Sequence, residues 1–531
     1  MEPPVVTEIS GQKPVAAARA WKVTTLAGAA SNFHLFIFTS ILFIAPNALF
    51  AAALRPVPAA LVLVGCAGAV AILWRERLRS DLFRAVVDRR QLGLCLALGF
   101  AVCLLGGGGH VFLPKSDWLI RDAVLADLVR EGFLALYRDA GQDYLLRAPL
   151  GMYLLPAMVG RFFGLYAAHL ALLTQNAGIV GMIAYFTTTV AQVRRAPMLL
   201  LLLGFSGLDI VGVFAAEAAE LAGGGAFMPV NHTEWWSQYF WPGRLQYSSL
   251  ITQFFWVPNH AAPGWWFALL ILLHARGAVR FPALLASFAP LLIWSPLSML
   301  GAAPFLALFA TWRWRTLLSR DVMASVAASL CFLPVAIYLV VDAGAVAHEW
   351  LILRDGFARL YPFFLLVEVP QAALVLYCFR YVATADRPVF WVALAILFIL
   401  PVYSFGPYND LMMRASIPAL FLLAFHFARI VVLTRSGGGA LASVASTLVL
   451  LAAATPFIEI VSALAPSYAI SDCDLLTGSH KLEPGKLPTN YLARIEKVPV
   501  WLVDPAGARA PRTVVDRKCW PDHPGLDESL K

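Results

Sequence analysis

The chain has 531 residues, of which 60% are hydrophobic and only 14% are charged. Soluble domains average about 25% charged residues, so a water-soluble fold could not bury this much apolar surface. The composition therefore excludes an ordinary soluble enzyme and indicates a protein that crosses a membrane many times. The net charge of +8 does not point to nucleic acid, because the Arg residues stand in short clusters between apolar segments, as the positive-inside rule predicts.

The apolar segments predict an all-α fold, a polytopic transmembrane helical bundle with about thirteen spans, since a spanning helix needs about 17–25 residues. One segment, 149–165, contains two prolines and an arginine, and we expect it only to dip into the membrane. The candidate spans are 33–54, 58–74, 91–112, 149–165, 168–190, 197–216, 264–274, 282–297, 300–311, 322–341, 360–381, 389–404, 412–432 and 440–464.

Basic clusters predict the orientation. The strongest cluster, 75–90, should be cytoplasmic, and two spans precede it, so the N-terminus should be cytoplasmic too. Alternating spans then place the 342–359 loop and the 406–410 turn outside. The predicted regions are a cytoplasmic N-terminal segment 1–32, a transmembrane domain 33–465 with external loops 113–148 and 217–263, and an extracytoplasmic tail 466–531.

The C-terminal tail is polar and contains two cysteines, Cys473 and Cys519. A disulfide between them would require an oxidising compartment. The tail is too short for a large core of its own, and we expect a small stapled appendage or a packed tail.

The external loop 113–148 begins with an abrupt change from apolar to charged residues. From Trp118 onward, the apolar residues fall on one helical stripe as far as Leu136, and Asp127 and Arg138 fall on the opposite face. This pattern predicts an external amphipathic helix that lies on the membrane surface.

Four charged residues open this helix: Lys115, Asp117, Arg121 and Asp122. A structural interpretation is that Ser116 or Asp117 caps the helix. A functional interpretation makes Asp117 a general base at the lipid–water boundary, with the neighbouring Lys115, Arg121 and Asp122 binding substrate. The two cations are suited to holding phosphate oxygens.

Two later segments carry polar residues that should share the same outer face. Trp256, Asn259 and His260 close a loop rich in Trp and Tyr. Most of those rings fit an aromatic belt at the membrane interface, but aromatic rings with Asn and His also suit sugar binding. A lone His is weak support for a metal site, because no second ligand stands at metal spacing.

The second segment is Asn409, Asp410 and Arg414 at the start of an apolar helix. The structural interpretation is an N-cap followed by an i,i+4 ion pair. The alternative is that Arg414 binds a lipid phosphate or pairs with a catalytic acid, because an Arg one turn into a membrane helix is costly unless it faces protein, water or an anion.

The arrangement around Asp117 resembles the GT-C superfamily of integral-membrane glycosyltransferases. In that superfamily the first large external loop begins with a catalytic Asp or Glu, continues as surface helices and returns through a Pro-containing, Tyr-rich segment. Here Asp117 matches the acid, Trp118–Arg138 the surface helix and Arg147–Pro156 the return. The resemblance implies a polyprenyl-phosphate-linked sugar as donor and transfer on the outer face. Asp117 has no adjacent second acid, which leaves a divalent cation cofactor an open question.

The function predicted from these observations is transfer of a sugar from a polyprenyl-phosphate carrier to a glycan or lipid acceptor, in contact with membrane lipids and without nucleic acid. The expected location is the bacterial inner (cytoplasmic) membrane. Two alternatives stay open: a transporter or flippase for a lipid-linked or anionic solute, and a polymerase or ligase of lipid-linked glycans that relies on Arg414. The chain has no Gly-rich phosphate loop, HExxH, CxxC or GxSxG motif, which argues against ATP-driven transport.

Overall fold

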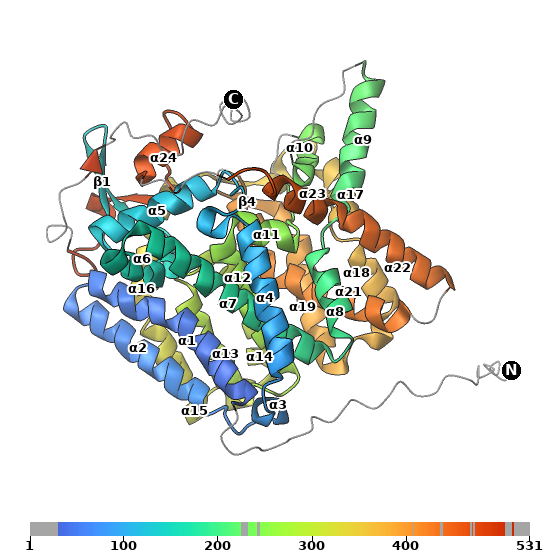
Figure 1. The fold of residues 1–531 in the computed structure, drawn as a ribbon, viewed down its shortest axis with the longest axis horizontal. Coiled ribbons are helices and arrows are strands. Elements are labelled where there is room, and N and C mark those ends of the chain that lie inside the picture. Colours follow the sequence, from blue (N-terminus) through green and yellow to red (C-terminus); the bar gives the residue numbers. More distant parts are fainter. Residues whose placement is uncertain are drawn as a thin grey trace.

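The computed structural model describes residues 30–224, 232–241, 245–406, 408–435, 439–467, 470, 473–504 and 512–513. These residues form a bundle of helices with a few short strands gathered at one end (Figure 1). The predominantly helical fold is thus confirmed, and the strands are a feature that the sequence did not predict.

The helices run in chain order through the described residues. Their bounds are α1 Asn32–Phe50, α2 Pro56–Trp74, α3 Asp81–Arg84, α4 Arg89–Leu105, α5 Trp118–Glu131, α6 Gly151–Phe163, α7 Leu165–Ala191, α8 Arg195–Leu203, α9 Asp209–Ala222, α10 Ser237–Phe240, α11 Leu250–Trp256, α12 Pro258–Ala275, α13 Phe281–Phe288, α14 Pro296–Trp312, α15 Arg320–Leu330, α16 Leu333–Val340, α17 Phe357–Glu368, α18 Gln371–Tyr377, α19 Arg387–Ile399, α20 Asp410–Ala415, α21 Ile417–Thr434, α22 Gly439–Ala452, α23 Ala454–Ala463 and α24 Leu475–Leu482.

Among the described residues, six helices are long and apolar enough to cross a membrane. The number rises to eight if each of two bent helix pairs is one span: α15 with the helix that begins at Leu333, and α17 with α18, bent by 42° and 64°. The expected count of about thirteen is therefore not confirmed. Several predicted spans are shorter helices, such as α8 with 9 residues and α13 with 8, and length alone does not show whether they cross.

Two small sheets lie at the end of the bundle that is uppermost in Figure 1. The larger has the strand order β5-β2-β1-β6, with β1 antiparallel to β2, β2 antiparallel to β5 and β1 parallel to β6. In the smaller, β3 pairs antiparallel with β4. The bounds are β1 Leu136–Asp139, β2 Gln142–Leu146, β3 His348–Trp350, β4 Tyr403–Phe405, β5 Leu492–Arg494 and β6 Arg512–Thr513.

The helix predicted for 118–138 ends early, and the remainder forms a hairpin. Glu131 is the last residue of α5, and Arg138 lies in β1, where it pairs with Asp143 of β2. The hairpin turn consists of Ala140 and Gly141, both with positive φ (46° and 80°), as a two-residue hairpin turn with matching strand twist requires. Gly141 lies just after the predicted helix, and no hairpin turn was predicted there.

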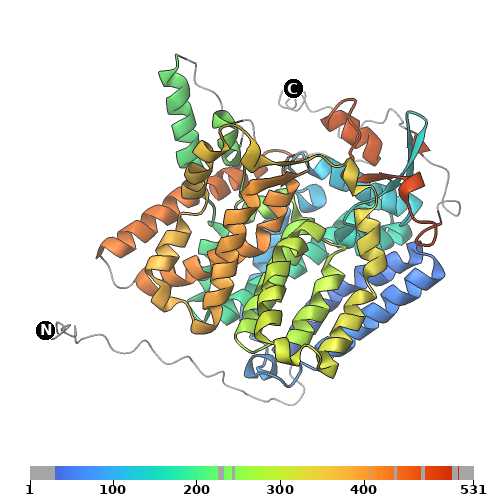
Figure 2. The ribbon, with the colours of Figure 1, turned by 180° about the vertical axis from the view of Figure 1, so that it is seen from behind.

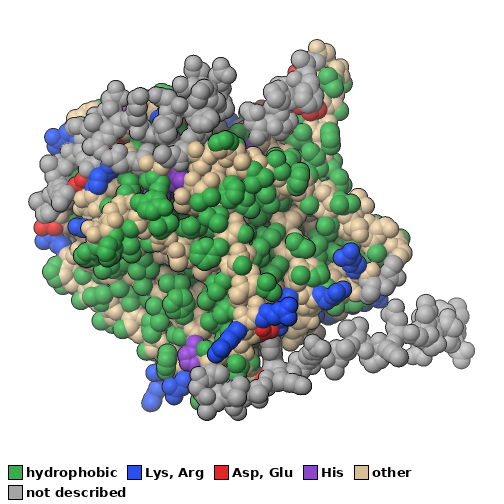
Figure 3. Space-filling view, in the orientation of Figure 1, with side chains coloured by type: hydrophobic (Ala, Val, Ile, Leu, Met, Phe, Trp, Pro, Cys, Tyr) green, Lys and Arg blue, Asp and Glu red, His purple; other side chains and the backbone are tan. Residues whose placement is uncertain are grey.

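The end of the bundle with the sheets collects the segments that were expected to share the outer face. The 342–359 loop meets the 403–406 segment through β3 and β4, and Asp342 forms an ion pair with Arg494 of the tail (3.0 Å). The basic clusters lie at the opposite end, where Arg75 and Arg280 both pair with Asp321. Figure 3 shows hydrophobic side chains over much of the flank and Lys and Arg side chains along its lower edge.

The start of α1 and the C-terminal tail lie at opposite ends of the bundle (Figure 1). Ser31 bridges to Val86 at the lower end, whereas α24 packs above α5. Seen from behind, the helices from the middle of the chain onward stand side by side (Figure 2). The structure thus separates two ends, and which end faces the cytoplasm remains a prediction.

The expectation that the helix after Asp117 lies on the membrane surface with one polar face open to water is wrong. Every residue of α5 from Trp118 to Leu128 is buried. Helix α6 packs on one side and α24 of the tail on another. The polar face is covered because Asp127 accepts hydrogen bonds from the Leu475 backbone N–H (2.9 Å) and the Tyr137 hydroxyl (2.8 Å).

The tail is therefore an integral part of this end of the molecule. Strand β5 joins the hairpin, and the backbone N–H of Arg147 donates to the Tyr491 carbonyl (2.7 Å). Cys473 is disulfide-bonded, and Cys519 lies outside the described residues. The tail covers the loop 113–148, which carries the predicted general base.

Candidate functional site

The N-terminal end of α5 is fixed against segments that lie far away in the sequence. The Trp118 indole donates to the Phe255 carbonyl (2.9 Å), which ties α5 to α11. The Ser298 hydroxyl lies 3.1 Å from the carbonyl oxygens of both His260 and Arg414. These contacts bring the three polar segments predicted from the sequence to one end of the bundle.

A glycine allows the closest of these approaches. Gly301 of α14 faces Ala415 of α20, and a Cβ at this position would overlap the Ala415 carbonyl oxygen. Helix α20 can therefore rest directly on the α14 backbone. This places Arg414 beside α12 and its His260.

Tyr491 of the tail lies among the charges at this site. Tyr491 is partly buried, and desolvation of its hydroxyl raises its pKa; the charges of Arg121, Asp117, Arg414 and Asp410 all act on it. The charges of Arg414 and Arg121 also act on His260. Arg121 and Arg414 therefore both lie within electrostatic range of Tyr491 and of His260, although nearly 300 residues of chain separate the two arginines.

Arg121 is the most deeply buried cation of this group, with 2% of its side chain exposed. Its guanidinium donates to the Asp117 carbonyl oxygen (2.8 Å), and a second nitrogen lies 3.4 Å from the Asp117 carboxylate. Its Nε has no hydrogen-bond partner among the described residues. A buried guanidinium N–H without an acceptor is costly unless a ligand supplies one.

Arg414 repeats this arrangement on the other side of the site. It forms the predicted i,i+4 ion pair with Asp410, and Asn409 caps α20 by accepting the Met412 backbone N–H. The structural interpretation of this motif is thus confirmed. The Nε of Arg414 is nevertheless buried and lacks a partner within the described part of the chain, so the ion pair leaves one donor open.

Asp117 is the most accessible acid of the group. Its side chain is 41% exposed, and it makes no capping hydrogen bond to the first turn of α5, so the capping role expected for it is wrong. The carboxylate can therefore meet a solute from outside while it stays beside Arg121.

The second predicted segment contributes buried polar groups rather than an aromatic surface. His260 Nδ1 lies 2.7 Å from the Ser295 hydroxyl. Asn259 is buried in the first turn of α12, and its side-chain oxygen lacks a partner in the described residues. The Trp256 indole donates to Glu459 (3.1 Å). The sugar-binding role predicted for these residues remains untested.

Lys115 is paired within the protein. Its ammonium lies 2.8 Å from Glu459 and 2.6 Å from the Ser462 hydroxyl. Glu459 also forms an ion pair with His232 (3.2 Å), whose pKa is lowered by burial. Lys115, which we expected to hold phosphate, is therefore already paired with Glu459 of α23.

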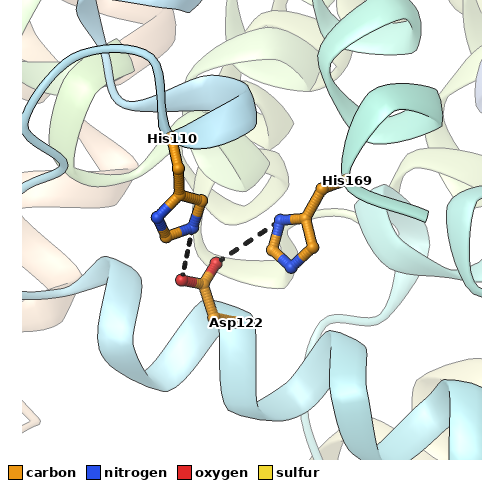
Figure 4. Close-up of side chains that lie close together, drawn as sticks. All are labelled: His110, Asp122 and His169. Carbon is orange, nitrogen blue, oxygen red and sulfur yellow. Dashed lines mark ion pairs between the residues drawn. The ribbon is translucent and has the colours of Figure 1, made fainter. Parts of the chain in front are cut away.

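Asp122 departs from the predicted cluster. It lies between His110 and His169, with His110 Nε2 2.8 Å from one carboxylate oxygen and His169 Nδ1 3.9 Å from the other (Figure 4). Both oxygens of Asp122 lack a hydrogen-bond partner with acceptable geometry among the described residues. These are the residues at this end whose donor atoms could hold a metal ion.

Sequence reasoning missed Tyr491, Glu459, His232, His110 and His169. Three of them carried a usable signal, because His110, His169 and Glu459 interrupt apolar segments that were predicted to span, and an ionisable residue there is a functional candidate by default. His110 follows a run of four glycines, which marks an unusual turn. Tyr491 carried no such signal, since only tertiary packing brings the tail to α5.

Comparisons of the chain with protein-family models, with curated proteins and with solved structures find no match. The function must therefore be argued from the site itself.

Proposed function

We propose that this chain is a membrane glycosyltransferase that moves a sugar from a polyprenyl-phosphate carrier to a glycan or lipid acceptor at the extracytoplasmic face of the bacterial inner membrane. The observation that carries the proposal is the pair of guanidinium groups, Arg121 and Arg414: each has a buried Nε–H that lacks an acceptor among the described residues, and the charges of both act on Tyr491. The phosphodiester of such a donor supplies acceptor oxygens and one negative charge to this site, and a second charge develops on the phosphate as the sugar leaves. The GT-C resemblance of the Asp117 loop agrees with this assignment.

The chemistry follows from the accessible carboxylate beside the two cations. Asp117 takes the proton of an acceptor hydroxyl, and that oxygen forms a bond to the anomeric carbon of the sugar. The bond between the anomeric carbon and the phosphate oxygen breaks, and the electron pair leaves with the polyprenyl phosphate. Arg121 and Arg414 stabilise the charge that develops on the leaving phosphate. His260 and Asn259, both buried beside Arg414, contribute polar groups to the sugar pocket.

The test compares Asp117→Asn with the unmodified chain, reconstituted in nanodiscs with undecaprenyl phosphate and with undecaprenyl-phosphate-linked sugars. Loss of a general base should lower transfer by about 100- to 10,000-fold, while binding of undecaprenyl phosphate changes by less than about twofold because both arginines remain. Asp143→Asn is the matched control, since Asp143 is a carboxylate of the same loop that pairs with Arg138. Transfer by the control should be unchanged.

Three outcomes would contradict the proposal. A folded Asp117→Asn variant that retains full transfer removes Asp117 from the reaction. Loss of transfer in Arg414→Ala with no effect of Asp117→Ala favours a polymerase or ligase that relies on the arginine. Movement of a labelled lipid phosphate across the bilayer of proteoliposomes without sugar transfer favours a transporter or flippase.

A further inference from the structure

The group formed by His110, Asp122 and His169 does not include the two arginines, and its side chains are almost fully enclosed. The exposed fractions of the three side chains are 3%, 1% and 1%. One ligand atom from each residue lies within 4.8 Å of the others. The rings of His110 and His169 stand edge to face, with centroids 5.2 Å apart, and both point toward the carboxylate (Figure 4).

Three elements that are distant in the chain supply these residues. His110 ends the short turn Gly108–His110 after α4, Asp122 lies in the first half of α5, and His169 is near the start of α7. The turn has positive φ at Gly107, Gly109 and His110 (89°, 70° and 56°). A histidine rarely adopts such a backbone conformation, and here it directs the imidazole toward Asp122.

The protein alone leaves this group incomplete. A buried carboxylate needs hydrogen bonds or a full counter-charge, yet neither oxygen of Asp122 has a hydrogen-bond partner among the described residues, and neither has Nε2 of His169. The adjacent cation in the sequence, Arg121, is engaged by Asp117. A cation held between the two imidazoles and the carboxylate would neutralise the charge of Asp122 and give its oxygens a partner.

We propose that His110, Asp122 and His169 bind a divalent transition-metal ion of the zinc class. Two imidazole nitrogens and one carboxylate oxygen form a donor set that zinc accepts, with the fourth position left for water or another ligand. Metal–ligand bonds of about 2.0–2.2 Å place tetrahedral ligand atoms about 3.3 Å apart. The present separations of 2.8 and 3.9 Å bracket that value, so small side-chain rotations would close the site.

Such an ion would join three elements that position the candidate active site. It would tie the turn after α4 and the start of α7 to α5, the helix that carries Arg121 and follows Asp117. This role does not depend on the reaction that the chain catalyses. The inference therefore stands or falls separately from the glycosyltransferase proposal.

The first experiment needs no variant. The full chain, purified in detergent with an affinity tag that contains no histidine, is stripped with a chelator and then titrated with Zn²⁺. We expect one equivalent of bound zinc by elemental analysis and a rise in Tm of several degrees on zinc addition, because a ligand that binds the folded state raises its stability. Less than about a tenth of an equivalent, with no change in Tm, would overturn the proposal.

The second experiment assigns the ligands. Asp122→Asn and His169→Ala should each lose the bound zinc and the zinc-dependent rise in Tm. His348→Ala is the matched control, because His348 lies in β3 outside the cluster and its loss should leave the stoichiometry unchanged. Zinc retained at full stoichiometry in the double variant His110→Ala/His169→Ala would overturn the assignment.

A third measurement remains informative if the alanine variants do not fold. His169→Cys keeps a ligand but changes its chemistry, so Co²⁺ loaded into this variant should gain a thiolate-to-metal charge-transfer band that the unmodified chain lacks. A Co²⁺ spectrum identical to that of the unmodified chain would place the metal elsewhere.

Discussion

The buried charged residues at the two ends of the bundle are paired to different extents. At the end with the basic clusters, acids and cations close on each other: Arg276 pairs with Asp386 (2.5 Å), and Arg280 pairs with Glu76 (2.7 Å). At the opposite end, Arg121 and Arg414 also have acidic neighbours, but each keeps a buried Nε–H for which the described part of the chain supplies no acceptor.

This difference distinguishes charged residues that stabilise the fold from charged residues that can bind a ligand. An ion pair whose partners satisfy each other contributes to the native state, and breaking it exposes the full cost of a buried charge. A buried guanidinium whose Nε–H has no acceptor already bears part of this free-energy cost in the native state. We therefore expect substitutions at the two ends to have different effects on stability and on ligand binding.

The largest expected effect on stability comes from Asp386→Asn. The Asp386 carboxylate is fully buried and accepts hydrogen bonds from two nitrogens of Arg276. Its neutralisation leaves the Arg276 charge without its counter-charge, and breaking a buried pair costs about 3–5 kcal/mol. The free energy of unfolding in detergent micelles measures this loss.

Asp88→Asn is the matched control for Asp386→Asn. Asp88 pairs with Arg195 at the same end of the bundle, but both side chains are about half exposed. An exposed pair contributes at most about 1 kcal/mol. Equal destabilisation by the two variants would show that burial does not set the strength of these pairs.

The second prediction concerns the docking of the tail on α5 and its dependence on pH. Burial raises the pKa of Asp127 from 3.8 to about 6, although the Leu475 backbone N–H, Tyr137 and Arg130 favour its charged form. The folded state thus binds the proton more tightly than the unfolded state. Stability contributed by this group is full below about pH 4 and is lost as pH rises toward and through 6, by about 3 kcal/mol for a shift of about two units.

Hydrogen exchange of α24 between pH 4 and 8 measures this dependence. In the unmodified chain, after correction for the intrinsic exchange rate, protection of α24 should fall as pH rises. Asp127→Asn removes the titrating group, so protection should become nearly independent of pH. Glu131→Gln, a change at the last residue of the same helix, should keep the dependence, and the same pH slope in all three chains would contradict this account.

The sequence predicted what depends on local pattern. The cap at Asn409 and the Asp410–Arg414 pair follow from i,i+3 and i,i+4 spacing, and the structure contains both. The gathering of the three polar segments at one end followed from alternating spans between basic clusters. These features require no knowledge of how the helices pack.

Tertiary packing decided the rest of the site. The tail covers the face of α5 that the helical pattern assigned to solvent. Lys115 pairs with Glu459, which comes from a distant predicted span. Asp122 stands one residue after Arg121, yet a rotation of about 100° along the helix turns it toward His110 and His169. Spacing along one segment cannot reveal partners that come from α4 and α7.

The smallest predicted change in stability has the opposite sign. Arg121→Met replaces a buried cation that is incompletely hydrogen-bonded with an apolar side chain of similar length. Asp117 loses its neighbour but is 41% exposed, so water can solvate its carboxylate. The free energy of unfolding should stay unchanged or rise by about 1–2 kcal/mol, because removal of a poorly compensated buried charge is neutral or stabilising.

The same variant should bind undecaprenyl phosphate at least about tenfold more weakly, since a hydrogen bond to a charged group contributes about 1.5–3 kcal/mol. Arg130→Met is the contrasting variant on the same helix. Arg130 pairs with the fully buried Asp127, so its removal should destabilise the chain without weakening lipid binding. If Arg121→Met is as destabilising as Arg130→Met, Arg121 holds the fold rather than a ligand, and the distinction between the two ends of the bundle fails.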